Sequence, residues 1–215
     1  MVLRGRIWDE LERVISLEEI DLIFIAPHGR RGLKKMMLGS VAEEIYRRAP
    51  CPVITVRPCA ADVPPMDDAL RGPLLFATDF GEASRHAFPY AVAFANEFRV
   101  PLIFLHVIPE VPLPEGPQWH MAGDIMRLRE NARAVTIEQL HRLALEGTMT
   151  CARICRVEFG LPSEQFVKTA DEVNAAGIIL GVKQPRYAGI ASHTPWHTAA
   201  EVVGSATCPV LTLKY

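Results

Sequence analysis

A loop rich in glycine and basic residues could bind an anion. Residues 26–40 read APHGRRGLKKMMLGS, so Gly29 and Gly39 enclose nine residues and Ser40 follows directly. The segment lies between an apolar run, DLIFI, and a stretch with helical apolar spacing. Glycine lets a backbone approach phosphate oxygens closely, and a helix N-terminus offers unpaired N–H groups with a positive dipole. The sequence therefore predicts phosphate contact here. Basic groups around the loop are His28, Arg30, Arg31, Lys34 and Lys35.

The same residues also have a purely structural explanation. Ser40-Val41-Ala42-Glu43 matches a capping box, which stabilises a helix by about 1 kcal/mol with or without a ligand. Gly39 would then be only a turn residue. The loop is not a Walker loop, because no Gly-Lys-Ser/Thr follows a four-residue spacer. On the residues alone, phosphate contact and simple capping stay open as alternatives.

The elements that position this loop follow from apolar periodicity. Strands are predicted at 21–26, 51–56, 73–79, 100–107, 150–159, 177–182 and 208–215. Helices are predicted at 9–20, 40–49, 82–98, 126–147, 163–176 and 198–206. Continuous apolar strands that alternate with helices are typical of a parallel sheet with helices on both faces, so an α/β fold is expected.

Part of the chain is repeated. Cys51-Pro52-Val53 recurs as Cys208-Pro209-Val210, and Asp21-Leu22-Ile23 recurs as Gly177-Ile178-Ile179. Residues 73–215 are predicted to form a complete domain, and residues 1–58 the closing part of a second copy that lacks its opening half. Residues 59–72, rich in Pro, Ala and Asp, are predicted to be a linker. The sequence leaves open whether the short copy is biological or comes from a misplaced start.

Four motifs, taken in the order in which the family has them, resemble motifs of the universal stress protein family. They are Thr78-Asp79-Phe80, Leu105-His106-Val107, the Gly29-x9-Gly39-Ser40 loop and Ala49-Pro50-Cys51-Pro52-Val53. The resemblance covers nearly the whole chain apart from the linker. It implies a five-stranded, adenine-nucleotide-binding α-hydrolase-like domain with sheet order 3-2-1-4-5. It also implies dimerisation through the last strands, and ATP binding in some members but not in those that lack the loop.

The resemblance also implies a set of nucleotide-binding residues. In the family the triphosphate lies along the glycine loop, and a further family glycine is Ala26 in this sequence. The expected contacts are Ala26, His28, Gly29, Arg30, Gly39, Ser40 and Val41, with Asp79 and Val107 added from the complete domain. For Asp79, capping of the following helix is the simpler interpretation.

The second copy of the loop, GVKQPRYAGIASHTPWHTAAE, has lost its glycines. It keeps Gly181, but Gln184 and Trp196 stand at the positions of the two loop glycines, and the indole is expected to fill the phosphate space. A capping box is predicted at 198–201. Neither copy then holds a complete site, so a full pocket would need complementation between the two segments or between chains.

Composition limits the remaining function classes. A net charge of −2 over 215 residues predicts no general attraction to nucleic acid, and no apolar run approaches the roughly twenty residues of a membrane span. Five cysteines without metal-ligand spacing suggest reduced thiols in the cytoplasm. His193 and His197 are four residues apart, but Pro195 lies between them and no third ligand is placed, so no metal is expected.

The sequence thus predicts a cytoplasmic, universal-stress-type binding or regulatory protein. No general base and no carboxylate pair accompany the loop, so an enzyme is not expected. The alternative is a dimerisation or interaction module of the same fold that binds no nucleotide. The short copy is too small to be stable alone, so residues 51–56 are expected to pair antiparallel with residues 209–214. The other edge of the short copy would stay open to self-association, making the chain its own partner.

Overall fold

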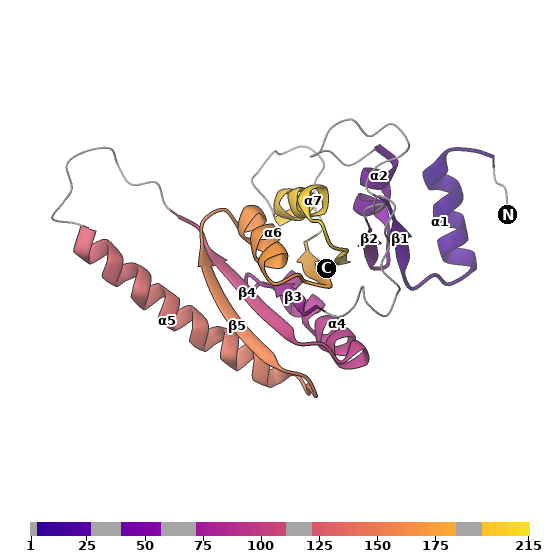
Figure 1. Cartoon of the computed structure of the whole chain (residues 1–215). Coiled ribbons are helices and arrows are strands. Elements are labelled where there is room, and N and C mark those ends of the chain that lie inside the picture. Colours follow the sequence, from indigo (N-terminus) through magenta and orange to yellow (C-terminus); the bar gives the residue numbers. More distant parts are fainter. Residues whose placement is uncertain (1–3, 27–39, 57–71, 111–121, 184–194) are drawn as a thin grey trace.

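The protein is described by a computed structural model over residues 4–26, 40–56, 72–110, 122–183 and 195–215. The described strands form one sheet in the order β1-β2-β7-β6-β3-β4-β5, shown in Figure 1. The strands are β1 (Ile23–Ile25), β2 (Val53–Thr55), β3 (Leu74–Ala77), β4 (Leu102–Ile108), β5 (Arg153–Phe159), β6 (Gly177–Val182) and β7 (Val210–Lys214). The helices are α1 (Ile7–Leu17), α2 (Ser40–Arg48), α4 (Glu82–Phe98), α5 (Ala122–Glu146), α6 (Pro162–Glu172) and α7 (Pro195–Ser205).

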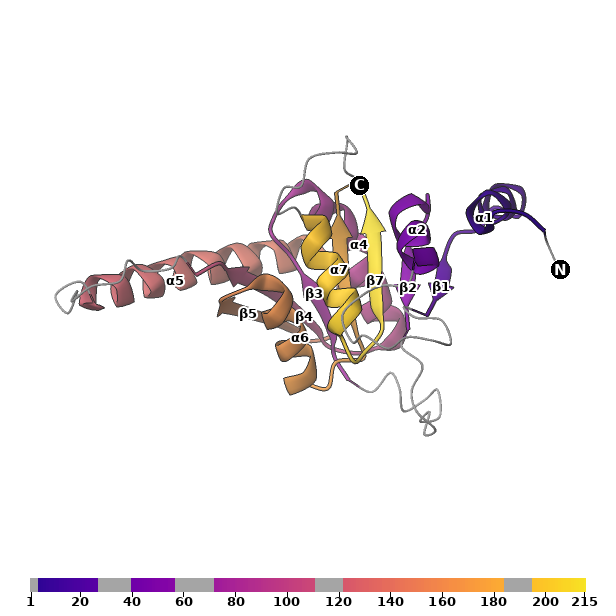
Figure 2. The same ribbon diagram turned by 90° about the horizontal axis from the view of Figure 1, so that it is seen from above.

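Strands β3 to β7 make the parallel five-stranded sheet that the sequence predicts. Their order, β5-β4-β3-β6-β7, is the expected 3-2-1-4-5 arrangement, so the fold class is confirmed. Helices α4 and α5 cover one face around Phe76 and Phe104. Helices α6 and α7 cover the other face around Leu75 and Ile178. The two layers are visible in Figures 1 and 2.

The short N-terminal unit extends this sheet through strand β2. Strand β2 pairs antiparallel with β7, with Ile54 opposite Leu211, and this is the pairing expected from the sequence. Ile54 and Leu211 occupy equivalent positions in the repeat, since Val53 corresponds to Val210. A local two-fold axis therefore passes between them and relates the short unit to the complete one. Both edges of β7 are occupied, by β2 and by β6.

The pairing of β1 shows that the alignment of the two sequence copies was one residue out in this strand. Ile23 pairs with Val53 in the short unit, and Ile178 pairs with Val210 in the complete one. Ile23 is thus equivalent to Ile178, whereas the sequence comparison had matched it to Ile179. In a strand, a slip of one residue exchanges the two faces. Ile23 and Ile178 are both buried and lie on the face covered by α2 and α7.

Polar contacts and packing at the junction hold the two units together. The Thr212 hydroxyl donates a hydrogen bond to the Val53 carbonyl oxygen over 3.2 Å. The Lys214 ammonium donates to the Ala49 carbonyl oxygen over 3.0 Å, at the C-terminal end of α2. Burial lowers the pKa of Lys214 to about 8 and raises the pKa of the Tyr46 hydroxyl, whose ring packs into the core of the complete unit.

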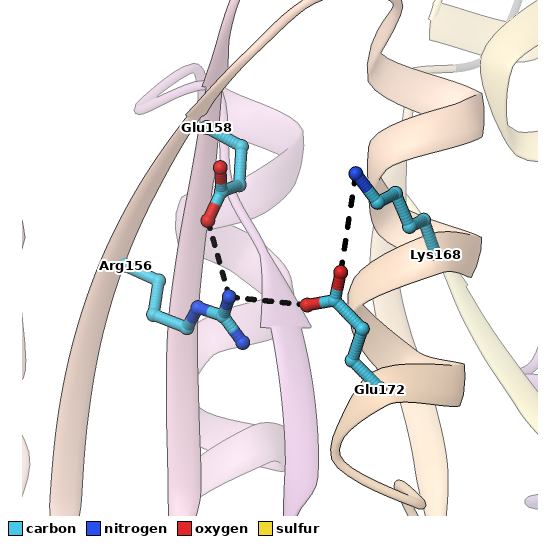
Figure 3. A network of polar contacts seen from close by, with 4 residues as sticks. All are labelled: Arg156, Glu158, Lys168 and Glu172. Carbon is cyan, nitrogen blue, oxygen red and sulfur yellow. Dashed lines mark hydrogen bonds and ion pairs between the residues drawn. The ribbon is translucent and has the colours of Figure 1, made fainter.

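At the opposite end of the sheet, charged side chains line the edge strand β5. Arg156 lies 3.2 Å from Glu158 on the same strand and 3.2 Å from Glu172 on α6. Lys168 extends the network by pairing with Glu172 at 3.9 Å, as Figure 3 shows. Charges on an edge strand disfavour pairing with another sheet.

Among the described helices, none combines the length and the apolar character needed to cross a membrane.

Candidate functional site

A pocket of about 240 Å³ opens at the carboxyl ends of β3, β4 and β6. Strand β3 lies between β4 and β6, so the chain leaves it first to one side and later to the other. Ligands of open α/β sheets bind at such a switch point. The pocket is lined by Ala77, Thr78, Asp79, Ser84, His106, Val107, Pro162, Phe166, Leu180, Gly181, Thr198 and Ala199. It therefore brings together Asp79 and Val107, two residues predicted from the sequence.

The turn after β3 is fixed by hydrogen bonds from Asp79. One carboxylate oxygen, Oδ1, accepts from the Gly81 backbone N–H and from the Ser84 hydroxyl, each over 2.8 Å. The Ser84 hydroxyl also accepts from the buried Thr78 hydroxyl over 3.1 Å. The N-cap of α4 is Gly81, without a side-chain cap bond, so the prediction that Asp79 caps this helix is wrong. Asp79 instead orders the turn that precedes the helix.

Phe80 and His106 stack on each other beside this turn. Phe80 has a φ of 61°, a left-handed conformation that costs a non-glycine residue free energy. Its N–H donates to the Thr78 hydroxyl over 3.0 Å, and its ring stacks on His106 with centroids 4.9 Å apart. His106 Nδ1 lies 2.8 Å from the Thr78 carbonyl oxygen, which can only accept, so this nitrogen carries the proton.

Gly181 allows helix α4 to cross close to strand β6. A Cβ atom at this position would lie 2.0 Å from the Ala83 carbonyl oxygen and 2.6 Å from the Ser84 nitrogen. The equivalent residue of the short unit, one position beyond β1, is the exposed Ala26. No counterpart of α4 lies in the described part of the short unit, so no described helix restricts the Cβ of Ala26. This explains why the family glycine is kept in one copy and not in the other.

In the second loop, helix α7 begins earlier than predicted. It starts at Pro195, so Thr198 lies inside the first turns and faces the pocket. The capping box predicted at 198–201 is therefore wrong, and His197 pairs with Glu201 at 3.2 Å instead. The prediction that the indole of Trp196 blocks phosphate concerns a side chain outside the described part, as does the one on Gln184.

The described ends of the glycine loop are Ala26, after β1, and Ser40, at the start of α2. Ser40 is the first helical residue, one position further in than a capping box requires, and Glu43 pairs with Arg47 at 3.6 Å. Ser40 and Val41 are both exposed. The predicted contacts His28, Gly29, Arg30 and Gly39 lie outside the described residues.

The two candidate half-sites lie at opposite ends of the strands: one at the carboxyl ends of β3, β4 and β6, the other at the carboxyl end of β1. Because β2 runs antiparallel to β7, the carboxyl ends of β1 and β2 point away from those of β3, β4 and β6. Ala26 and Ser40 are therefore not brought to the Asp79 pocket. Complementation of one site by the two segments of a single chain, which the sequence left open, is excluded by this topology.

Several pocket residues were not predicted as site residues. Thr78 and His106 belong to quoted motifs, and their motif positions were the available signal. Ser84 and Thr198 gave no comparable signal, because a helical serine or threonine close to a strand end is common. Their role depends on how α4 and α7 approach β3 and β6.

The parallel sheet, the switch-point pocket and the repeated closing strand define an α/β protein with a pocket at the carboxyl ends of its strands. The universal stress protein family model matches residues 1–57 and 71–214, so this chain belongs to the universal stress protein family, a family of stress-response proteins. The prediction of the family is confirmed, and the split match is consistent with a two-part arrangement.

Individual relatives are similar over shorter stretches. Universal stress protein Rv2005c of Mycobacterium tuberculosis is 31% identical over 99 residues, which are 46% of this chain and 32% of that protein. Universal stress protein MJ0531 of Methanocaldococcus jannaschii is 36% identical over 56 residues, 26% of this chain and 33% of that protein. The chain thus matches about a third of the length of these relatives.

Two solved structures share the fold over nearly the whole chain. A universal stress protein from Archaeoglobus fulgidus has a TM-score of 0.62 at 20% identity and covers 95% of this chain and 66% of its own. The protein PA1789 from Pseudomonas aeruginosa, described as functionally unknown, has a TM-score of 0.65 at 19% identity, over 98% and 69% respectively. At these identities the likeness concerns the fold.

Proposed function

We propose that this chain is a cytoplasmic binding or regulatory protein that holds the phosphates of an adenine nucleotide, ATP in the first place, on the loop between Ala26 and Val41, without turnover. The observation that supports this best is the placement of the loop ends. Ala26 follows a parallel strand and the exposed Ser40 begins α2, so the loop leads from a carboxyl strand end into a helix N-terminus. That geometry suits an anion.

The position of this loop implies that phosphate, more than base, is recognised. Asp79 and Val107 line the pocket at the carboxyl ends of β3 and β4, which point away from the carboxyl end of β1. They therefore cannot contact a nucleotide on the 26–41 loop of the same chain. The described part of the short unit offers no counterpart of either residue. Inorganic tripolyphosphate is therefore expected to compete with ATP at similar concentrations, since the adenine adds little.

Equilibrium dialysis of the full chain with labelled ATP tests the proposal. Gly39→Trp should abolish binding, because it fills the space next to the helix N-terminus. Asp79→Ala is the matched control and should leave ATP affinity unchanged, because it lies at strand ends that point the opposite way. Unchanged affinity in Gly39→Trp, or lost affinity in Asp79→Ala, would overturn the assignment. Phosphate release from ATP over hours would contradict the absence of turnover.

A second candidate, an interaction module that binds no nucleotide, has its own support. The elements that would contact phosphate and base lie at strand ends that point in opposite directions. In addition, Oδ1 of Asp79 already accepts two hydrogen bonds, from the Gly81 N–H and the Ser84 hydroxyl. If neither ATP nor tripolyphosphate binds the unmodified chain at millimolar concentration, this candidate replaces the first.

A further inference from the structure

The short unit leaves an apolar strip of the sheet without a helix above it in the described structure. The strip consists of Phe24 on β1 with Ile54 and Val56 on and after β2, on the face that carries α4 and α5. Phe24 is 66% exposed, whereas its equivalent in the complete unit, Ile179, is 2% exposed. Val56 is 38% exposed, and its equivalent Leu213 is 1% exposed. In the complete unit Ile179 and Leu213 belong to the core under α4, and Ile54 packs against the border of that core.

Helix α4 presents an aromatic flank toward this strip. On its other flank Asn96 donates to the Thr148 carbonyl oxygen over 2.9 Å, so that side faces the end of α5. Tyr90, Phe94 and Phe98 are spaced by four residues and lie on the flank away from α5. His86, one turn earlier, has its ring centroid 5.6 Å from that of Tyr215, beyond the end of β7. This flank is therefore the one next to β7 and β2.

The outer surface of α4 is itself apolar at its centre. Pro89, Tyr90 and Ala93 are exposed there, and Glu82, Arg85 and Glu97 are the exposed charged residues around them. An apolar centre with a polar rim is the usual composition of a protein interface. One face of the molecule thus carries a helical ridge beside an apolar strip that no described helix covers.

We propose that a second copy of this chain docks on this face, with α4 of each copy lying in the strip of the other. A two-fold rotation about an axis parallel to the strands, between α4 and the strip, exchanges ridge and strip. The contact is then isologous and closed, as in most homodimers. In the complete unit the inner face of α4, around Ala87 and Ala91, covers the strands equivalent to β1 and β2; in the dimer the outer face of the partner's α4 takes that place.

Two other routes to self-association, through β7 and through β5, are less favourable. The last strands, β2 and β7, pair with each other inside the chain and leave β7 no free edge. Edge strand β5 carries Arg156 and Glu158, and Arg156 pairs with Glu158 and with Glu172 on α6. The exposed parts of the strip and the aromatic flank amount to roughly 400 Å² of apolar surface, about half of what one partner contributes to a standard interface. The polar rim supplies the remainder.

Sedimentation velocity of the full chain from about 1 to 100 µM tests the dimer. The unmodified chain should move from a mass of 23.9 kDa toward twice that value as its concentration rises. Phe24→Glu and Tyr90→Glu should each weaken the dimer roughly tenfold or more. The matched control is Leu128→Glu, because Leu128 is 67% exposed on the half of α5 that extends beyond the sheet in Figure 1. That control should leave the dimer unchanged.

The outcomes separate this surface from others. A chain that stays monomeric at 100 µM overturns the proposal, and so does a dimer that Phe24→Glu and Leu128→Glu affect equally. Circular dichroism shows whether Phe24→Glu is folded, and Phe24→Ser replaces it if it is not. Mixing Phe24→Lys with Tyr90→Glu should give a tighter dimer than either variant forms alone, since one of the two contacts becomes an ion pair. Because the surface includes neither the 26–41 loop nor the Asp79 pocket, the result is independent of nucleotide binding.

Discussion

Replacing Gly181 by alanine should destabilise the protein far more than the reciprocal change at its structural equivalent, Ala26→Gly. A Cβ atom at Gly181 would lie 2.0 Å from the Ala83 carbonyl oxygen, and real Cβ contacts essentially never fall below 3.0 Å. The first turn of α4 must therefore retreat by about 1 Å. That turn is tied to Asp79 through the Ser84 hydroxyl at 2.8 Å, so the retreat also stretches this hydrogen bond.

The expected cost of Gly181→Ala is about 3 kcal/mol, from overpacking against backbone and a weakened hydrogen bond. Ala26→Gly removes a methyl group that meets no helix, so its cost should stay within about 1 kcal/mol, the usual penalty for glycine. Urea unfolding at 25 °C, followed by far-UV circular dichroism, measures both free energies of unfolding. Equal effects of the two substitutions, or a loss below about 1 kcal/mol for Gly181→Ala, would refute the explanation of why only one copy keeps this glycine.

Three further results are expected. The Pro52 carbonyl points toward β1, so the Val53 N–H points toward β7, and Val53→Pro removes it. This substitution should lower the free energy of unfolding by about 3 kcal/mol and make residues 1–56 sensitive to limited proteolysis. Burial lowers the pKa of Lys214 from 10.5 to about 8, so the folded chain binds fewer protons than the unfolded chain between these values. Stability should rise from about pH 8 to 10.5, and Lys214→Met should lose this rise. The measurement is the difference in free energy of unfolding, from urea titrations across this pH range, between the unmodified chain and Lys214→Met. A difference is needed because the raised pKa of the Cys51 thiol changes stability with pH in the opposite direction. Residues 73–215 expressed alone should fold, show no thermal protection by millimolar ATP, and dimerise through the freed edge of β7, as light scattering can determine.

Most of the fold could be predicted from the sequence because it depends on local patterns. The apolar runs fix the strands, and helix α4 has the predicted bounds, 82–98. The pairing of β2 with β7 could also be predicted, because a small unit with two apolar strands needs a partner and the repeat supplies an equivalent strand. Helix α6 was predicted too long. It ends at Glu172, and Asn174 takes a left-handed φ of 48°, which apolar periodicity does not reveal.

The site was less predictable because it depends on the relative direction of distant strands. Antiparallel pairing of β2 with β7 had been expected, yet its consequence for the loop and Asp79 emerges only when the whole sheet is assembled. The roles of Ser84 and Thr198 follow from the approach of two helices to one switch point. The start of α7 at Pro195 depends on tertiary packing, since proline is tolerated in the first turn of a helix.

The junction of β2 with β7 also determines the order in which the chain can fold during synthesis. Val53 pairs with Thr212, which is translated 159 residues later, so the short unit leaves the ribosome well before its partner strand. At ordinary rates of translation this delay is on the order of 10 to 30 s. Throughout it, β1 and β2 have no sheet to join, while strands β3 to β6 can already assemble with their helices. The short unit is thus made before the complete unit and folds after it, and a ribosome-bound chaperone would meet its apolar strands before β7 does.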